Sequence, residues 1–150
     1  RIIPRGPVKI KDIFDMFPWP DQIVTIKLDK SQLKEALECG VAAYPSGEGR
    51  FPFVGGLRFA FDALKPVGQR VDIDSLTFPD GSPITNERKY TLCCKSFIQE
   101  GKDGYDILKA MKCIVDKESA PDIYQVMFKC WKRFNPITDE EIESQKSDCC

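Results

Sequence analysis

Histidine is absent from this chain of 150 residues. Because histidine is the commonest metal ligand in proteins and the usual general base near neutral pH, most metallohydrolase sites and nucleophile–base pairs cannot be assembled here. The seven cysteines include no C-x-x-C pair, which also disfavours a zinc site. We therefore expect no catalytic residue, no metal site and no bound cofactor within this chain.

An excess of charge of one sign is also missing, as are long hydrophobic runs. The 22 basic and 23 acidic side chains leave a formal net charge of -1, which gives no field to attract nucleic acid or an anionic membrane. No apolar run approaches the roughly 20 residues that a membrane span needs. We expect neither nucleic-acid binding nor a membrane span. The chain opens on Arg1, so we expect it to be part of a longer protein.

The cysteines indicate a reducing compartment. Their number is odd, Cys93 and Cys94 lie in an apolar segment expected to be a strand, and Cys130 lies on the apolar face of an expected helix. Such positions favour free thiols that act as small buried hydrophobic groups. The chain also lacks an N-x-S/T glycosylation sequon. Together these features favour a cytoplasmic protein.

Hydrophobic periodicity predicts a mixture of helices and strands. Apolar positions at helical spacing predict a helix over residues 10–17, a second that Asp29 and Gln32 cap and that ends near Tyr44, and a brief one around residues 107–108. Alternating or β-branched stretches predict strands, the last two joined by a turn at residues 79–82. The expected strands span residues 23–28, 57–62, 70–78 and 89–95.

The last part of the chain contains a six-residue apolar stripe at helical spacing. We interpret this stripe as a surface that packs into a core. Thr138 and Glu141 form a capping box that predicts a further, polar helix at the end of the chain. The residues of the stripe are Ile123, Val126, Met127, Cys130, Trp131 and Phe134.

The predicted fold is of the α+β class, a mixed β-sheet with helices packed against it. A chain of this length can bury a single core, so one domain is expected. We place that domain at residues 1–110. Residues 111–150 are expected to form a helical extension packed on the same domain.

The most informative segment is residues 96–105. It places Phe97 six residues before Asp103, and Asp103 stands in a Gly-x-Asp-Gly turn formed by residues 101–104. Glycines on both sides of an acid allow left-handed or tightly bent backbone, which brings the carboxylate and nearby amide groups close to a ligand. The segment is thus suited to hold a flat polar molecule.

Two further segments make the pattern at residues 96–105 more specific. Residues 6–19 run from Gly-Pro through a short amphipathic helix to Pro-Trp, and residues 55–62 read Gly-Gly-Leu-Arg-Phe-Ala-Phe-Asp. In this order and spacing, the three segments resemble the C-terminal domain of the 5′-nucleotidase family. The resemblance runs from about residue 1 to residue 108 and does not reach the rest of the chain.

The resemblance implies roles for three side chains. In the family, two aromatic rings of this domain sandwich the nucleobase, and by motif position these are Trp19 and Phe97. Such a stacked ring is worth on the order of 1–3 kcal/mol per base. Trp19 stands where the family usually has phenylalanine, which can change the base that fits. Asp103 matches the acid that accepts hydrogen bonds from the ribose hydroxyls.

The resemblance also implies roles for the glycines and for the cationic residues around that acid. Gly101 and Gly104 form the substrate-binding turn. Lys102 replaces one glycine of the usual Gly-Gly pair, which either alters the turn or brings an ammonium group to a phosphate. Family members direct an arginine from just before the Gly-Pro corner toward the ligand, and Arg1 is the nearest candidate, with Arg5 a weaker one.

The implied function is that of the nucleoside-recognition domain of a two-domain metallophosphoesterase. In that family an N-terminal metallophosphoesterase domain of the same protein holds two divalent metal ions that activate water. Two alternatives stay open from the sequence. One is a non-catalytic nucleotide sensor or interaction module, and the other is a hydrolase domain for a phosphoester that is not a nucleotide.

Overall fold

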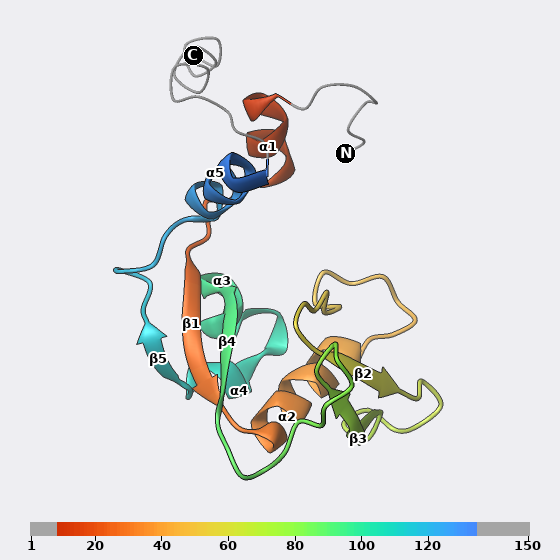
Figure 1. Ribbon diagram of the computed structural model, residues 1–150. Helices are drawn as coiled ribbons and strands as arrows, with labels where there is room; N and C mark the ends of the chain where they lie inside the picture. The colour runs from red at the N-terminus through yellow and green to blue at the C-terminus, as the bar shows by residue number, and fades with distance from the viewer. Residues whose placement is uncertain (1–8, 135–150) are drawn as a thin grey trace. The chain divides into compact units, whose positions relative to one another are not determined.

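The computed structural model describes residues 9–134 of the chain (Figure 1). These residues divide into two compact units, one made of residues 9–23 and 117–134 and the other of residues 24–116. Arg1 and the helix expected from Thr138 lie outside the described residues. The domain boundary expected at residue 110 stays a prediction. Within residues 9–134, no helix is both long enough and apolar enough to cross a membrane.

The smaller unit is a pair of helices held together by aromatic rings. The ring centroid of Phe14 lies 4.5 Å from that of Tyr124 and 6.1 Å from that of Phe128. The hydroxyl of Tyr124 also donates a hydrogen bond to the carbonyl oxygen of Phe17. These contacts pack the helix expected at residues 10–17 against the helix that carries the apolar stripe. The two helices are α1 (Ile10–Met16) and α5 (Ile123–Phe134).

The apolar stripe on α5 is only partly a core surface. Ile123 is buried, but Val126 is 37% exposed and Cys130 is also exposed. The rings that contact Phe14 come from positions 124 and 128, outside the expected stripe. The core interpretation was therefore wrong for Val126 and Cys130. Its physical reason is that, within this unit, α5 packs on a helix of only seven residues.

The larger unit combines helices with small β-sheets, which confirms the α+β class. Its strands form a three-stranded sheet in the order β4-β1-β5 and a two-stranded sheet of β2 and β3. Each strand expected from the sequence is present, but the strands divide between two sheets. The strands are β1 (Ile23–Leu28), β2 (Arg58–Phe61), β3 (Val71–Thr77), β4 (Tyr90–Lys95) and β5 (Lys112–Val115).

The connection between β3 and β4 differs from the expected one. The expected turn forms, since Phe78 N–H donates to Ser82 O at 2.8 Å and Gly81 N–H donates to Phe78 O at 3.0 Å. The chain then continues through residues 83–89 before β4 joins β1 in the other sheet. The turn therefore does not pair the two strands that flank it.

Strand β5 was not expected from the sequence. It pairs antiparallel with β1, with Cys113 opposite Ile26 and Lys112 opposite Lys27. Its four residues, Lys-Cys-Ile-Val, do not alternate between polar and apolar side chains, so they give no clear strand signal. Residues that follow the expected domain thus complete the sheet on which that domain is built.

Helix α2 (Lys30–Val41) begins at the cap that the sequence predicts. The side chain of Asp29 accepts a hydrogen bond from Gln32 N–H at 3.0 Å, and Gln32 Oε1 accepts one from Asp29 N–H at 2.9 Å. The hydrogen bond from the Ser31 side chain, followed by that from the Gln32 backbone, lowers the pKa of Asp29. This reciprocal capping box is typically worth about 1 kcal/mol and fixes where the helix starts.

An arginine just before β3 closes the other end of α2. Nη1 of Arg70 donates hydrogen bonds to the carbonyl oxygens of Val41 at 2.8 Å, Ala42 at 2.9 Å and Tyr44 at 3.0 Å. The last carbonyl groups of a helix lack partners within the helix, and a cation there also offsets the helix dipole. The helix therefore ends at Val41, slightly before the expected end.

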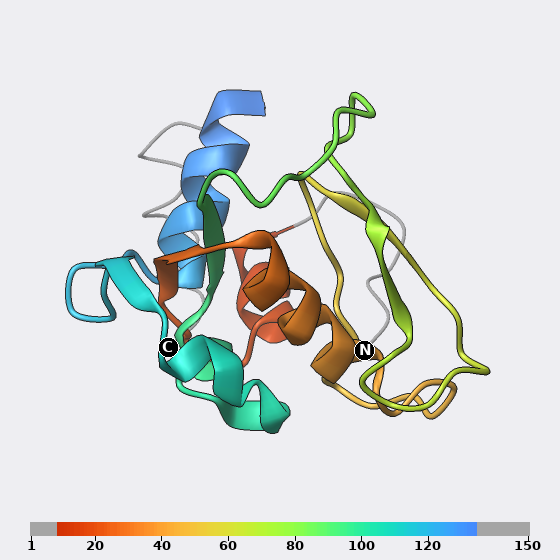
Figure 2. The same cartoon turned by 90° about the horizontal axis from the view of Figure 1, so that it is seen from below.

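A buried carboxylate attaches α2 to β3. Glu38 is only 6% exposed. Its Oε1 accepts from Val71 N–H at 2.7 Å, and its Oε2 accepts from Arg70 N–H at 3.0 Å. Because both oxygens have backbone donors, burial of this side chain is compensated. Figures 1 and 2 show α2 between the two sheets of the larger unit.

The remaining helical pieces lie after β4 and carry the segment of greatest interest. They confirm the brief helix expected around residues 107–108. The buried face that they share with α2 includes Tyr105 and Leu108. These pieces are α3 (Ser96–Gln99), the single 3-10 turn η1 (Lys102–Gly104) and α4 (Asp106–Lys109).

The cysteines within residues 9–134 form no disulfide with one another, and their free-thiol state stays a prediction. Their burial was partly mispredicted, because Cys93 and Cys130 are exposed. Cys94 packs against the core of the larger unit, as the sequence indicates, and Cys113 packs there too. Burial, followed by the charges of the two nearby thiols, raises the pKa of Cys94 to about 11.

Candidate functional site

Phe97 is presented on the surface by the first helical turn after β4. The strand ends at Lys95, and Phe97 stands in α3 rather than at the end of the strand itself. Its neighbour Ser96 is 2% exposed, whereas Phe97 is 41% exposed. A large aromatic ring that remains this exposed is available to contact a ligand.

The turn around Asp103 has left-handed backbone at three residues. Gly101 has φ = 82°, Asp103 has φ = 55° and Gly104 has φ = 85°. The glycines therefore serve the purpose expected from the sequence, since only glycine adopts such angles without cost. Asp103 is the one described non-glycine residue with positive φ, which costs on the order of 1–2 kcal/mol. Backbone strain of this kind is often found at ligand-binding turns.

A buried tyrosine directly follows the turn and connects it to a distant segment. Tyr105 is 5% exposed, and its hydroxyl donates to the carbonyl oxygen of Arg50 at 2.6 Å. The thiol of Cys39 lies 3.7 Å from the carbonyl oxygen of Asp103, within reach of a weak S–H hydrogen bond. Burial, then the charges of Cys39 and Asp103, raises the pKa of Tyr105 to about 12, with Arg50 opposing the shift. Tyr105 therefore stays a neutral donor near neutral pH.

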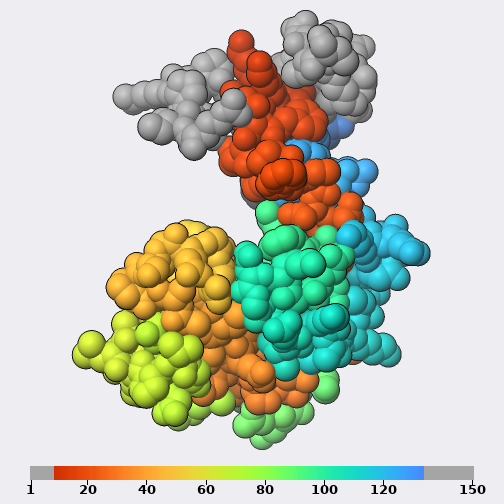
Figure 3. Space-filling view, turned by 180° about the vertical axis from the view of Figure 1, so that it is seen from behind, coloured from red at the N-terminus to blue at the C-terminus, as the bar shows by residue number. Residues whose placement is uncertain are grey.

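The segment at residues 48–51 lies beside the turn. Arg50 Nε forms an ion pair with Glu48 Oε2 at 2.7 Å. A Cβ at Gly49 would lie 4.0 Å from Asp103 Oδ2, and a Cβ at Gly104 would lie 3.5 Å from Arg50 Nη1. In the space-filling view, the yellow-orange surface of this region adjoins the teal surface of the Asp103 region (Figure 3). No short sequence pattern links residues 48–51 to a turn so far along the chain, so the sequence alone does not indicate this proximity.

The expected site residues are distributed unevenly between the units. Phe97 and the residues 101–104, which include the exposed Lys102, belong to one short stretch of the larger unit. Trp19 belongs to the smaller unit, where it follows α1 and is 73% exposed. Its pairing with Phe97 across a slot stays a prediction. Arg1 lies outside the described residues.

The described residues do not offer a metal centre. Between residues 9 and 134, no group of three or more His, Cys, Asp or Glu side chains is placed to hold an ion. The guanidinium of Arg50 lies near the Asp103 turn, and a guanidinium has no lone pair to offer a metal. The chemistry that this site can supply is hydrogen bonding and stacking.

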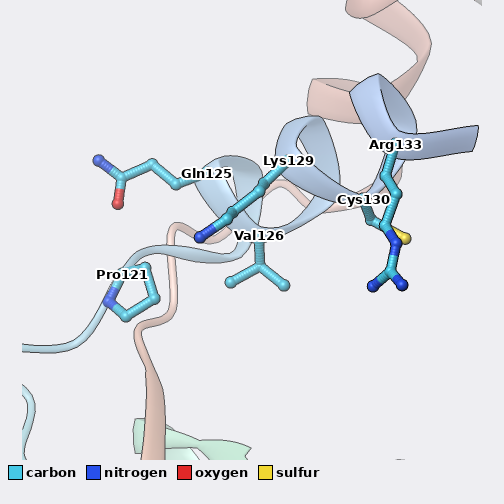
Figure 4. Close-up of a pocket in the computed structure, with 6 residues that line it drawn as sticks. All are labelled: Pro121, Gln125, Val126, Lys129, Cys130 and Arg133. Carbon is cyan, nitrogen blue, oxygen red and sulfur yellow. The ribbon is translucent and has the colours of Figure 1, made fainter. Parts of the chain in front are cut away.

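A separate pocket lies along the face of α5 that carries Val126 and Cys130. Its volume is about 460 Å³, and two cationic side chains, Lys129 and Arg133, line it together with the exposed Val126 and Cys130 (Figure 4). Pro121 and Gln125 complete the lining. None of the expected site residues lies there, so this pocket is distinct from the Asp103 turn.

An α+β unit that carries an exposed aromatic ring and, six residues later, an acid in a glycine-flanked turn is suited to recognise a small polar molecule. The chain belongs to the family described as 5′-nucleotidase, C-terminal domain, which matches residues 1–110. The residue segments on which the sequence resemblance rested all lie within that match. The resemblance to this family is therefore confirmed.

Relatives from animals and bacteria share this part of the chain. Protein 5NUC from Lutzomyia longipalpis is 29% identical over 116 residues, which cover 73% of this chain and 20% of that protein. The Bos taurus 5′-nucleotidase is 25% identical over 153 residues, which cover 97% of this chain and 27% of that protein. The chain thus spans about a fifth to a quarter of the length of these relatives.

Solved structures show the same fold. The structure of a 5′-nucleotidase precursor from Thermus thermophilus superposes with a TM-score of 0.70 at 32% identity, covering 79% of this chain and 24% of that one. The Haemophilus influenzae NAD nucleotidase superposes with a TM-score of 0.65 at 20% identity, covering 83% of this chain and 24% of that one. At 20% identity, the similarity to the Haemophilus influenzae protein is a similarity of fold alone.

Proposed function

We propose that this chain is the nucleoside-recognition domain of a two-domain 5′-nucleotidase-type phosphoesterase. The observation that carries the proposal is the pairing, within one short segment, of an exposed Phe97 with an Asp103 held in strained backbone. The family membership supports the proposal, as do the relatives named 5′-nucleotidase. The substrate of the whole protein is then a nucleotide.

The catalytic half belongs to an N-terminal domain outside this chain. Two divalent metal ions bound in that domain supply the activated water for attack on phosphorus. This chain binds and orients the substrate, which lowers the barrier by bringing the phosphate to the metals in a productive geometry. No bond is made or broken by the residues described here.

Each site residue has a part in that binding. The rings of Phe97 and Trp19 stack on the two faces of the base, because every base offers a π-face regardless of its sequence identity. The carboxylate of Asp103 accepts hydrogen bonds from the ribose hydroxyls, since an ionised carboxylate is acceptor-only and can take a vicinal diol. In this proposal the ammonium group of Lys102 reaches a phosphate of the ligand, and Arg1 is the nearest candidate for the arginine that the family directs toward the ligand.

A ligand-observed NMR titration with adenosine and uridine tests this function. We expect the unaltered chain to bind the nucleosides weakly, because a nucleoside has no phosphate and therefore lacks the contacts that the phosphate of a nucleotide would add. Phe97→Ala reduces affinity by roughly ten- to hundredfold, the value of one stacked ring. Leu64→Ala is the control, since Leu64 is 96% exposed and has no part in the proposed site. Equal affinities for Phe97→Ala and Leu64→Ala would contradict the proposed role of the ring.

A further inference from the structure

The residues opposite Asp103 form a closed β-turn. Phe51 N–H donates to Glu48 O at 3.2 Å, which leaves Gly49 and Arg50 as the two central residues of the turn. The ion pair between Glu48 and Arg50 spans Gly49 at 2.7 Å. The hydrogen bond from Tyr105 to Arg50 O attaches this turn to the segment that contains Asp103. The two turns are therefore connected through the side chain of Tyr105.

Gly49 is the residue of this turn that faces the acid. A side chain there would meet one described atom within 4 Å, Oδ2 of Asp103 at 4.0 Å. The φ angle of Gly49 lies outside the left-handed region, so the backbone at this position does not require glycine. The missing side chain instead leaves open space beside the carboxylate. A hydroxyl group that donates to Oδ2 would lie about 2.7 Å from that oxygen, and a larger side chain at position 49 would extend toward the same oxygen.

We propose that the turn at residues 48–51 is a wall of the sugar subsite and that Gly49 is a specificity-determining residue for ribose. Because Gly49 has no side chain, the vicinal diol of ribose can reach the Asp103 carboxylate. Arg50 acts as a positioning residue, because its carbonyl oxygen holds Tyr105 and its guanidinium holds Glu48 across Gly49. This inference rests on the proposed function, since it names the part of the ligand that the same site selects.

Gly47 in the same loop provides a matched control. A Cβ at Gly47 would meet no atom within 4 Å, and its φ angle also lies outside the left-handed region. Alanine or valine at either position therefore has a similar effect on the backbone and on the unfolded chain. Only the substitutions at Gly49 place carbon atoms beside Asp103.

The experiment compares a ribonucleoside with its 2′-deoxy and 3′-deoxy analogues by protein-observed NMR titration of the whole chain. The probe is uridine, and the variants are Gly49→Ala, Gly49→Val, Gly47→Ala and Gly47→Val. We expect the unaltered chain and both Gly47 variants to prefer uridine over the deoxy analogues. Gly49→Ala reduces uridine affinity by roughly three- to tenfold, the size of one hydrogen bond. Gly49→Val reduces it further, and the preference over the deoxy analogues falls toward unity.

Two results separate the failure of this inference from the failure of the proposed function. If the unaltered chain prefers uridine and Gly49→Val retains the same preference, the proposed role of Gly49 in the sugar subsite is overturned and nucleoside recognition is left intact. An unaltered chain whose amide signals do not respond to any nucleoside would overturn the proposed function, and the inference with it. A Gly49 variant whose affinities for uridine and for both deoxy analogues fall by the same factor would also overturn the inference, because that pattern reports general damage to the site.

Discussion

The hydroxyl of Tyr105 donates a hydrogen bond to the carbonyl oxygen of Arg50 at 2.6 Å, joining two segments that lie far apart in the sequence. The donor is buried, and the acceptor belongs to the turn that faces Asp103. The backbone on both sides of the candidate site is therefore connected through one side chain.

Replacing that hydroxyl tests how much this connection stabilises the fold. Tyr105→Phe leaves the carbonyl oxygen of Arg50 without its donor and is expected to lower the free energy of unfolding by about 1 kcal/mol. Chemical denaturation measures the change. Tyr44→Phe is the control, because Tyr44 is 42% exposed. A loss in Tyr105→Phe no larger than that in the control would contradict a stabilising role.

Glu38 provides a second test, of the contact between α2 and β3. Glu38→Ala removes the acceptor of two backbone N–H groups, from Arg70 and Val71, and is expected to destabilise the chain by about 1–3 kcal/mol. Glu35→Ala on the exposed side of the same helix is the matched control, with little expected change. Thermal or denaturant unfolding of both variants distinguishes them. Equal stability of the two variants would show that the buried carboxylate contributes nothing.

The neighbouring thiols of Cys93 and Cys94 are expected to differ in reactivity. Cys93 is exposed, whereas burial raises the pKa of Cys94 to about 11 from an ordinary value of 9.0. A raised thiol pKa keeps the unreactive protonated form at neutral pH, so Cys94 alkylation should become appreciable only as pH rises toward 11. Mass spectrometry after timed alkylation without reductant measures both rates. Cys94 labelling as fast as Cys93 at neutral pH would contradict the buried placement.

Local sequence signals predicted the elements whose stabilising contacts are also local. The Asp29–Gln32 capping box is formed by residues close together in the chain, and the strand expected from the β-branched residues at 23–28 is present as β1. The left-handed glycines around Asp103 were likewise readable, because glycine is the residue that such angles favour.

Contacts between distant segments could not be predicted in this way. The position of Gly49 beside Asp103 depends on a hydrogen bond between residues 50 and 105, which no short pattern encodes. The division of the strands between two sheets has the same origin, because strand pairing is decided by tertiary packing. Cys130 is exposed because α1 is a short helix that covers little of α5. The periodicity of α5 alone does not indicate the length of its partner helix.

A protein-observed NMR titration of the isotopically labelled chain with adenosine and uridine tests the central claim most directly. If this chain recognises nucleosides, the indole N–H signal of Trp19 and the amide signals of Phe97 and Asp103 shift together with one dissociation constant. Asp103→Asn then reduces the preference for ribose over 2′-deoxyribose while the Trp19 shift persists, because the stack does not depend on the carboxylate. If these signals stay unmoved at high nucleoside concentration, nucleoside recognition by this domain is contradicted.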